Sequence, residues 1–372
     1  MASSYTWHPG AHGIGAIWPL SKPLMVDELF SSWLVRVALA HGCRPGTLTS
    51  FVWPQRRIWT RDFDRGLELP ELAALAAYSG ISAVALQRST LRHAAQMLLE
   101  NQVKPIGVWP WVLVLGCRNR FHAGGLQCCP ECFTQSDAYY RVQWRLAWHT
   151  SCPVHGVNLI DCCQHCHSPL QPSLLGPESQ LTHCSACGFS LGMCARTSPS
   201  PDALAFQQYA DALVSEVGLY GNVKLGFAQW MRVARAMISL LQVAARRRSD
   251  VLVRFCEKLG VDIFSMSPSL LGLPFEYLAE ADRARLLAGA WMMMSAGPDR
   301  FMSEASRASL PVTALHIPAN GAPDILIEMA GALKIHSPRR PTTRDLSQPR
   351  TQLEVLRMWL RLTRRMRRSG HC

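Results

Sequence analysis

The feature that most constrains this chain is a series of four short cysteine and histidine pairs in its middle third. In chain order the pairs are Cys129 with Cys132, Cys152 with His155, Cys163 with Cys166, and Cys184 with Cys187. Two residues separate the members of each pair, which is the spacing of a knuckle that holds two ligands on one tight turn. Because two knuckles complete a tetrahedral shell, the order of the pairs predicts two metal sites in tandem.

The ligand types of the two sites predict zinc with a structural role. The first set offers three thiolates and one imidazole, and the second offers four thiolates, both of which are zinc shells. A catalytic zinc keeps one coordination position open for water, whereas both sets here are closed. We therefore expect two structural Zn²⁺ ions per chain, which supply folding free energy to a small, turn-rich region, and no catalytic residues.

Two further cysteines stand directly before knuckle residues, Cys128 before Cys129 and Cys162 before Cys163. We expect both to be small buried residues; the alternative is that either one replaces its neighbour as a ligand. The chain has 14 cysteines, which in a small secreted protein would indicate disulfides. In a chain of 372 residues without a recognisable export signal, their clustering favours metal.

Residues 1–125 have the periodicity of amphipathic helices. After Asp27, a predicted N-cap, apolar residues recur at three- and four-residue steps up to Gly42, and a second short helix is predicted to begin at Pro45. Residues 71–92 follow the pattern of a helix-turn-helix, with Gly80 in the turn and Ser82 as the second N-cap.

The second helix of that motif is expected to carry Gln87, Arg88 and Arg92 outward. Arg88 and Arg92 are therefore candidate contacts to DNA. A plain helical hairpin is the alternative, because many hairpins share this pattern.

The stretch between the first two knuckles is rich in aromatic residues and arginine. Its aromatic members are Tyr139, Tyr140, Trp144 and Trp148. We expect them to form the small core around the metal, with stacking on bases as the alternative. Arg141 and Arg145 are expected to face phosphates or an acidic partner.

The last part of the chain is predicted to be helical and to end in a basic tail. Residues 195–203 are rich in serine and proline and predict a linker. Helical periodicity returns in residues 227–245 and 282–295, where the methionine run 292–294 is expected to fill the core. A final helix over residues 351–370 has an apolar stripe flanked by arginine, which favours nucleic acid over an anionic membrane or an acidic protein. Its candidate contacts are Arg357, Arg361, Arg364, Arg365, Arg367 and Arg368.

Charge and composition agree with a nucleic-acid or nucleoprotein partner. The chain has 38 Lys+Arg against 26 Asp+Glu, a net charge of +12. Its longest apolar runs are about half the ~20 residues of a membrane span, which predicts a chain without membrane association in the cytoplasm. The expected fold class is mainly α with small zinc-ribbon β elements. We expect a helical domain with the helix-turn-helix over residues 1–125, tandem zinc modules over 126–195, and a second helical domain over 196–372.

The N-terminal segment and the knuckles follow one another as in a known family. Residues 18–42 contain a proline, an acidic pair and the string LFSSWLVRVA; then come C-P-x-C, Y-x-R-x-x-W, C-P-x-H-G, C-x-x-C and C-x-x-C-G. In these motifs the chain resembles the TniQ family over about residues 18–190. His167 departs from the family, in which glycine is common at that position, and is expected to change the backbone of its knuckle.

The resemblance implies a target-selection factor of bacterial heteromeric transposition systems. Such proteins are not transposases; they bind target DNA or an RNA-guided CRISPR effector and recruit an AAA+ ATPase regulator. The family's two zinc ligand sets carry over onto the four knuckle pairs. Its ATPase-proximal segment carries over onto residues 27–36, where the candidate contacts are Asp27, Glu28, Trp33 and Arg36.

Three functions compete at this point. The first is the transposition adaptor, located at the nucleoid, with a homodimer left open as its assembly. The second is a stand-alone, zinc-dependent, sequence-specific DNA-binding regulator, and the third is a zinc enzyme. The sequence has no P-loop, H-E-x-x-H or G-x-S-x-G motif, which argues against nucleotide hydrolysis and acyl transfer.

Overall fold

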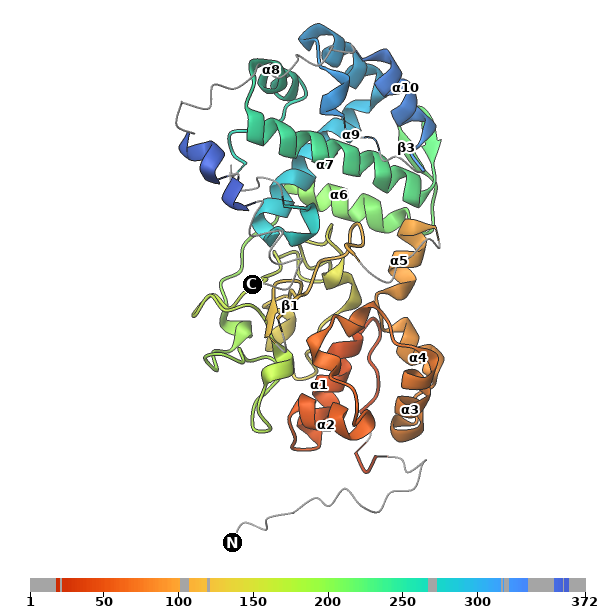
Figure 1. Cartoon of the computed structure of the whole chain (residues 1–372), viewed down its shortest axis with the longest axis vertical. Helices are drawn as coiled ribbons and strands as arrows, with labels where there is room; N and C mark the ends of the chain where they lie inside the picture. The colour runs from red at the N-terminus through yellow and green to blue at the C-terminus, as the bar shows by residue number, and fades with distance from the viewer. Residues whose placement is uncertain are drawn as a thin grey trace. The chain divides into compact units, whose positions relative to one another are not determined.

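The fold is known from a computed structural model that describes residues 18–20, 22–100, 107–118, 121–266, 273–315, 317, 321–333, 351–356 and 358–360. Contacts divide the chain into two compact units, Met1–Lys334 and Ile335–Cys372. Helices dominate the described part, so the predicted mainly helical fold class is confirmed (Figure 1). The three-domain division stays a prediction.

The first part of the larger unit is a cluster of short helices. These are α1 (Phe30–Ala40), α2 (Pro45–Val52), α3 (Leu69–Ser79), α4 (Ala83–Arg88) and α5 (Arg92–Leu99), with 3-10 turns at Ile58–Thr60 and Phe63–Arg65. Helix α1 buries the predicted apolar face, including Phe30, Trp33 and Leu34. The prediction that Asp27 caps this helix is wrong, because the N-cap is Leu29 and has no side-chain cap.

Helices α3 and α4, joined by a short turn, occupy the stretch predicted as a helix-turn-helix. The predicted second helix is shorter than expected, because α4 ends at Arg88 and Arg92 begins α5. Gly80 takes a left-handed conformation at the end of α3, which an L-residue with a side chain adopts only at a cost. Ser82 caps α4 by accepting a hydrogen bond from the backbone of Ala85 at 3.2 Å. Arg88 and Arg92 are exposed, as predicted, but Gln87 is half-buried and lies against the backbone of Gly66.

The middle of the chain has little regular structure. Strands β1 (Gly116–Arg118) and β2 (Phe121–Ala123) pair antiparallel, and single antiparallel bridges join Cys128 to Ile160 and Cys162 to Pro169. Four 3-10 turns accompany them, at Cys132–Thr134, Val142–Arg145, Pro172–Leu174 and Leu191–Met193. A region with so few ladder hydrogen bonds depends on other interactions for its stability.

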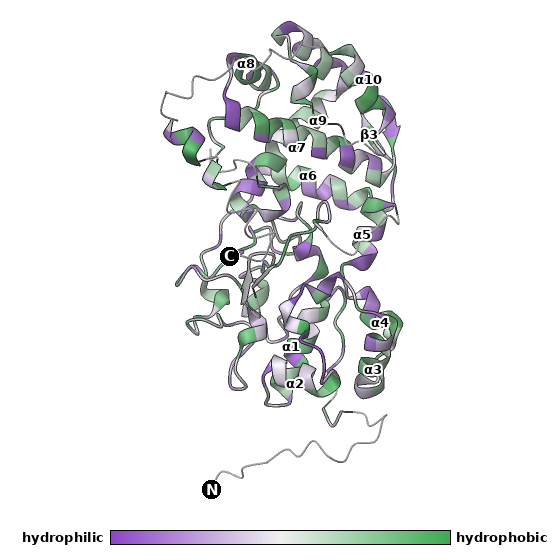
Figure 2. Cartoon of the chain, viewed as in Figure 1, coloured by the Kyte–Doolittle hydropathy of each residue, from purple (hydrophilic) through white to green (hydrophobic). Residues whose placement is uncertain are grey.

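The last part of the larger unit is a helical layer around two long helices. Its elements are α6 (Pro201–Ala212), β3 (Gly218–Tyr220), β4 (Val223–Leu225), α7 (Phe227–Arg247), α8 (Asp250–Lys258), α9 (Glu280–Ala308) and α10 (Asp324–Ala332). Helix α9 packs against α6, α7 and α8. Figure 2 shows hydrophobic and hydrophilic residues alternating around α7, and its apolar face is buried. The predicted linker is shorter than expected, because residues 201–203 already belong to α6.

The long helix α9 bends at Gly297 and Pro298. Gly297 has a non-helical backbone with a φ of 74°, and proline cannot donate the hydrogen bond that would continue the helix. Pro298 lies so close to Gly221 that a Cβ on that glycine would come within 2.6 Å of the proline ring. The bend in α9 therefore packs directly against the turn between β3 and β4, which has room only for glycine at position 221.

The smaller unit is described only in part. Residues 352–356 and 358–360 are helical, in agreement with the start of the predicted final helix. The six arginines predicted to bind nucleic acid in this tail lie outside the described residues. None of the described helices combines the length and the apolar character that crossing a membrane requires.

Candidate metal centres

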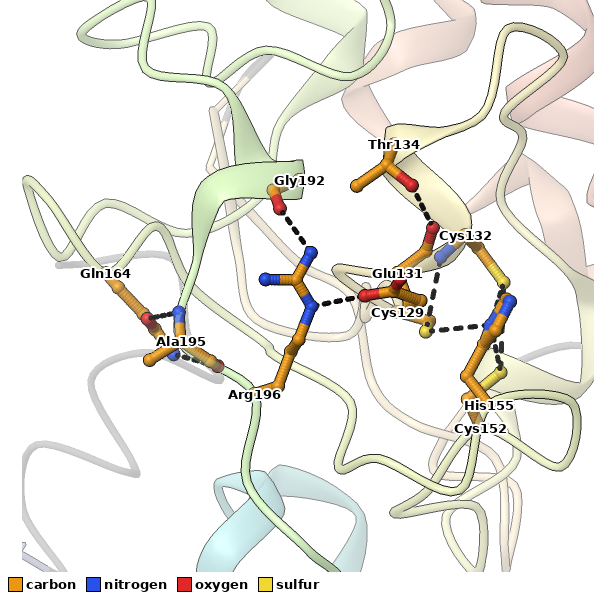
Figure 3. Close-up of polar contacts among 10 residues, drawn as sticks. All are labelled: Cys129, Glu131, Cys132, Thr134, Cys152, His155, Gln164, Gly192, Ala195 and Arg196. Carbon is orange, nitrogen blue, oxygen red and sulfur yellow. Dashed lines mark hydrogen bonds and ion pairs between the residues drawn. The ribbon is translucent and has the colours of Figure 1, made fainter.

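The first predicted ligand set comes together in one place. The sulfur of Cys132 lies 3.8 Å from that of Cys152, and Nδ1 of His155 lies 3.3 Å from the sulfur of Cys132. The same nitrogen lies 3.6 Å from the sulfurs of Cys129 and Cys152 (Figure 3). Four ligand atoms from two turns that are far apart in the sequence thus surround one point.

The second predicted set is assembled in the same way. The sulfurs of Cys163 and Cys187 lie 3.8 Å apart, and those of Cys166 and Cys184 lie 3.7 Å apart. All ligand atoms of each set lie within 4.8 Å of one another. Each group can therefore hold one metal ion.

The separations fit a tetrahedral zinc shell. Zn–S bonds of about 2.3 Å and Zn–N bonds of about 2.0–2.1 Å put two sulfurs ~3.8 Å apart and a sulfur and a nitrogen ~3.5 Å apart. Disulfides do not explain the groups, because a bonded pair of sulfurs is only about 2.05 Å apart. Metal binding requires thiolates, which the cysteines of each group would supply by losing their protons when the ion binds.

Three of the four knuckles share one backbone conformation. In each, the residue after the second ligand donates its N–H to the backbone carbonyl of the first cysteine at 2.8–2.9 Å. The pairs are Gly156 to Cys152, His167 to Cys163, and Gly188 to Cys184. These three residues have positive φ angles of 62°, 57° and 74°. The expectation that His167 changes its knuckle is therefore wrong: it adopts the conformation of the two glycines, at the cost that a Cβ imposes there.

Aromatic side chains pack around the first group, as predicted. Tyr140, Trp144 and Trp148 are buried, and Tyr139 is half-buried. Phe133, within the knuckle turn, meets Tyr140 edge to face with ring centroids 5.0 Å apart. Phe133, Tyr140 and Trp144 lie between the ligands Cys132 and Cys152 in the chain, so one segment supplies both the ligands and this aromatic packing.

Neither of the two extra cysteines belongs to a ligand group. Cys128 is fully buried and exchanges two backbone hydrogen bonds of 2.9 Å with Ile160. Burial raises the pKa of the Cys128 thiol well above its usual range, so it stays protonated. Cys162 is half-buried beside Pro169. Cys128 thus fills the expected role of a small buried residue.

The two metal groups are tied together by the segment that follows the second one. Arg196 forms an ion pair with Glu131, which lies inside the first knuckle, and donates a hydrogen bond to the carbonyl of Gly192 (Figure 3). Gln164, inside the third knuckle, exchanges two hydrogen bonds with the backbone of Ala195. Residues 195–196 of the predicted linker are therefore anchored to both modules.

The two arginines of the aromatic stretch face carboxylates of the same chain. Arg141 pairs with Asp27 at 2.9 Å. Arg145 is buried, and its guanidinium lies 2.7 Å from Asp62 and 3.1 Å from Asp64. The expectation that Arg141 and Arg145 face phosphates or an acidic partner is wrong, because these ion pairs use both side chains inside the fold.

The carboxylate of Asp64 is the centre of a buried polar cluster. It accepts hydrogen bonds of 2.8 Å from the backbone N–H and the hydroxyl of Ser31 at the start of α1. Burial raises the pKa of Asp64 to about 6, and the charge of Arg145 opposes that rise. The cluster joins α1, the 3-10 turn Phe63–Arg65 and the first metal module.

The four residues predicted to contact an ATPase differ in their exposure to solvent. Trp33 is buried and donates its indole N–H to the carbonyl of Lys22 at 3.0 Å. Glu28 is fully buried and pairs with Arg36 at 2.7 Å. Asp27 keeps 28% of its side chain exposed beside Arg141. Of the four, only Asp27 and Arg36 present atoms at the surface.

Sequence reasoning missed the polar residues that join the metal modules to the C-terminal helices. Arg283 of α9 is buried and donates to Gln127 and to the carbonyl of Ala147, both at 2.6 Å. Gln207 of α6 accepts hydrogen bonds of 3.1 Å from the backbone N–H groups of Thr150 and Ser151. A polar residue within an otherwise apolar helix face is the only local signal of such a contact.

Comparison with known proteins gives a family match over the N-terminal part of the chain. The model of the TniQ family matches residues 19–159. The match takes in helices α1 to α5 and the first ligand group through His155, and it ends before the second group. No curated protein matches the chain. Residues 19–159 of this chain are therefore similar to the TniQ family.

Proposed function

We propose that this chain is a non-catalytic adaptor for target-site selection in heteromeric DNA transposition. Its TniQ domain already indicates a transposition-associated target-selection protein. The finer proposal is that the chain binds target DNA or an RNA-guided CRISPR effector and recruits an AAA+ ATPase regulator. A place in the cytoplasm, at the nucleoid, goes with this role.

The observation that carries the proposal is that the residues matched by the family model include one complete ligand group. The matched residues contain both knuckles of the first group. A closed shell of three thiolates and one imidazole leaves no coordination position for a substrate. Cys129, Cys132, Cys152 and His155 would hold one zinc ion and the four later cysteines a second, and each ion would supply structural cross-linking.

The structure supports a rigid adaptor because the metal modules contact both helical parts. Arg145 reaches the N-terminal turn through Asp64, and Arg283 of α9 reaches Gln127 beside the first knuckle. All these residues lie in one compact unit. Surfaces on the two helical parts would therefore keep a constant separation, which suits a protein that must hold two partners in register.

A pull-down and a transposition assay test the adaptor. Immobilised full-length protein, loaded with zinc, is incubated with a candidate AAA+ ATPase, in the presence and absence of target DNA. We expect capture of the ATPase, and loss of directed insertions in cells when the gene is deleted. DNA binding without ATPase capture would instead favour the stand-alone DNA-binding regulator, and directed insertion that survives deletion would contradict the adaptor.

The basic tail is proposed as a nucleic-acid contact on its composition. Deleting residues 351–372 should weaken DNA binding and lower its dependence on salt, because fewer phosphate contacts release fewer counterions. An unchanged salt dependence would assign the tail to a protein partner. Arg88 at the end of α4 and Arg92 at the start of α5, both exposed, are the second proposed contact.

A further inference from the structure

An arginine-rich cleft lies between the N-terminal helices and the second metal module. Its volume is about 770 Å³. Polar side chains along it come from α2 and its N-cap, from the Ile58–Thr60 turn and the two residues before it, and from the Pro172–Leu174 turn: Arg44, Thr47, Thr49, Ser50, Arg56, Arg57, Thr60 and Ser173. No acidic side chain lines it within the part of the chain that the structure describes. We propose that this cleft binds the phosphodiester backbone of target DNA, an inference that rests on the proposed function.

Two of the arginines keep their charge available for a ligand. Arg44 and Arg57 are exposed and form no ion pair with any described residue. Arg56 pairs with Glu71 at 3.0 Å, and Arg61, just outside the cleft, pairs with the same carboxylate at 2.8 Å. Glu71 is buried and neutralises only one of these two cations, so the neighbourhood of the cleft keeps a net positive charge.

The neutral groups in the cleft also suit phosphate. The exposed side chains of Thr47 and Thr60 line it with hydroxyl groups. Arginine and hydroxyl groups are among the groups that contact DNA phosphates, and the arginine fork matches two phosphate oxygens.

The walls indicate that the cleft positions a nucleic-acid backbone and does not read bases. Trp59 is the one aromatic residue among the described lining residues, and it is 9% exposed. Its indole N–H donates to Thr49 at 3.0 Å, which holds the ring in the core. Because no ring is presented for base stacking, binding should be insensitive to sequence and strongly dependent on salt.

The second metal group positions one wall of the cleft. Ser173 and Leu175 lie between Cys166 and Cys184 in the chain, and Leu175 is buried. The Pro172–Leu174 turn packs against α1 and α2. The second module, which lies beyond the family match, would thereby complete a binding surface together with the TniQ domain.

The test is DNA binding by the full-length, zinc-loaded chain, measured by fluorescence anisotropy on two unrelated duplexes between 50 and 200 mM salt. The cleft variant carries Arg44→Gln and Arg57→Gln. The matched control carries Arg254→Gln and Arg300→Gln, which remove two exposed arginines on α8 and α9 whose side chains donate to backbone carbonyls. Both double variants lower the net charge equally.

We expect the cleft variant to bind both duplexes at least about tenfold more weakly, with a log–log salt slope lower by about 2, because each phosphate contact contributes about 0.9. The control should stay within about twofold of the unaltered chain. If the double variant fails to fold, Arg57→Gln alone should lower the slope by about 1.

Equal binding of DNA by the cleft and control variants would overturn the proposed cleft and leave the proposed function intact. An RNA duplex of the same length is measured in parallel, and a loss of binding seen only with this RNA would have the same consequence. Failure of the unaltered chain to bind any duplex would overturn the cleft together with direct DNA binding. Capture of the AAA+ ATPase by the cleft variant separates these cases, because it tests the adaptor without the cleft.

Discussion

The guanidinium of Arg145 lies 3.1 Å from the carboxylate of Asp64, and both side chains are at most 2% exposed. This buried pair connects two parts of the chain that are 81 residues apart. Ser31 hydrogen-bonds the same carboxylate from the start of α1. This charge pair thus joins the N-terminal helices to the first metal module. Because both side chains are buried, water cannot take the place of either partner if the other is removed.

Replacing Arg145 should be strongly destabilising. Arg145→Met leaves Asp64 buried without its counter-charge, which costs about 3–5 kcal/mol of unfolding free energy. Arg141→Met is the matched control, because its pair with Asp27 is partly exposed and should be worth about 1 kcal/mol or less. Urea denaturation of the zinc-loaded proteins measures both, and similar losses for the two variants would contradict the structural role of the buried pair.

Removing a ligand from either metal group should remove one zinc ion per chain. Cys129→Ser and Cys184→Ser each break a four-ligand shell, so zinc content should fall from about two to about one, with aggregation on purification. Cys128→Ala is the control, because this buried thiol lies outside both groups. Zinc is counted by elemental analysis. Soluble ligand variants that retain about two zinc ions per chain would refute the ligand assignment.

His167→Gly should stabilise its knuckle. The residue is exposed and has a φ of 57°, where an L-residue pays about 1–2 kcal/mol, partly offset by the greater chain entropy of unfolded glycine. We expect a net gain of about 0.5–1 kcal/mol in thermal or urea unfolding.

The reverse change at the equivalent position is the control. Gly188 has a φ of 74°, and a Cβ there would meet no atom within 4 Å. Gly188→Ala should therefore lose about 1 kcal/mol through backbone conformation alone. A loss on His167→Gly would mean that the imidazole makes a stabilising interaction of its own.

The carboxyl group of Glu280, at the start of α9, should make stability depend on pH. Burial raises its pKa from 4.5 to about 7, with Asp161 adding to the rise and Arg283 and Arg285 opposing it. The folded chain therefore holds a proton that the unfolded chain releases in this range. Its contribution is fully present below about pH 4.5 and is lost as pH rises through about 7, by up to about 3 kcal/mol.

Glu280→Gln tests this sign. The variant should gain stability relative to the unaltered chain between pH 5 and pH 8, because its side chain does not ionise. Glu257→Gln, an exposed change on α8, should show no such trend. An equal difference between the unaltered chain and Glu280→Gln at both pH values would show that Glu280 ionises normally in the folded chain.

Several features could be predicted from the sequence because they depend on neighbours in the chain. The buried face of α1 follows from three- and four-residue steps, and the turn between α3 and α4 follows from Gly80 and Ser82. The knuckle spacing predicted both ligand groups, because two residues between ligands set the geometry of one turn. Even there the backbone of His167 was mispredicted, since the hydrogen bond to Cys163 imposes the same turn on histidine and glycine alike.

What the sequence determined by itself was therefore local: the helices, the knuckles and the residues available to hold metal. Only the tertiary structure decided that Arg145 pairs with Asp64, that Arg283 reaches Gln127 across 156 residues, and that Arg44 and Arg57 share a cleft with Ser173. The path of the whole chain decides whether a given arginine faces a carboxylate of the same chain or stays free for DNA. The reason is that burial makes an unpaired ion costly, so the fold places each buried arginine beside an acceptor, however distant in sequence.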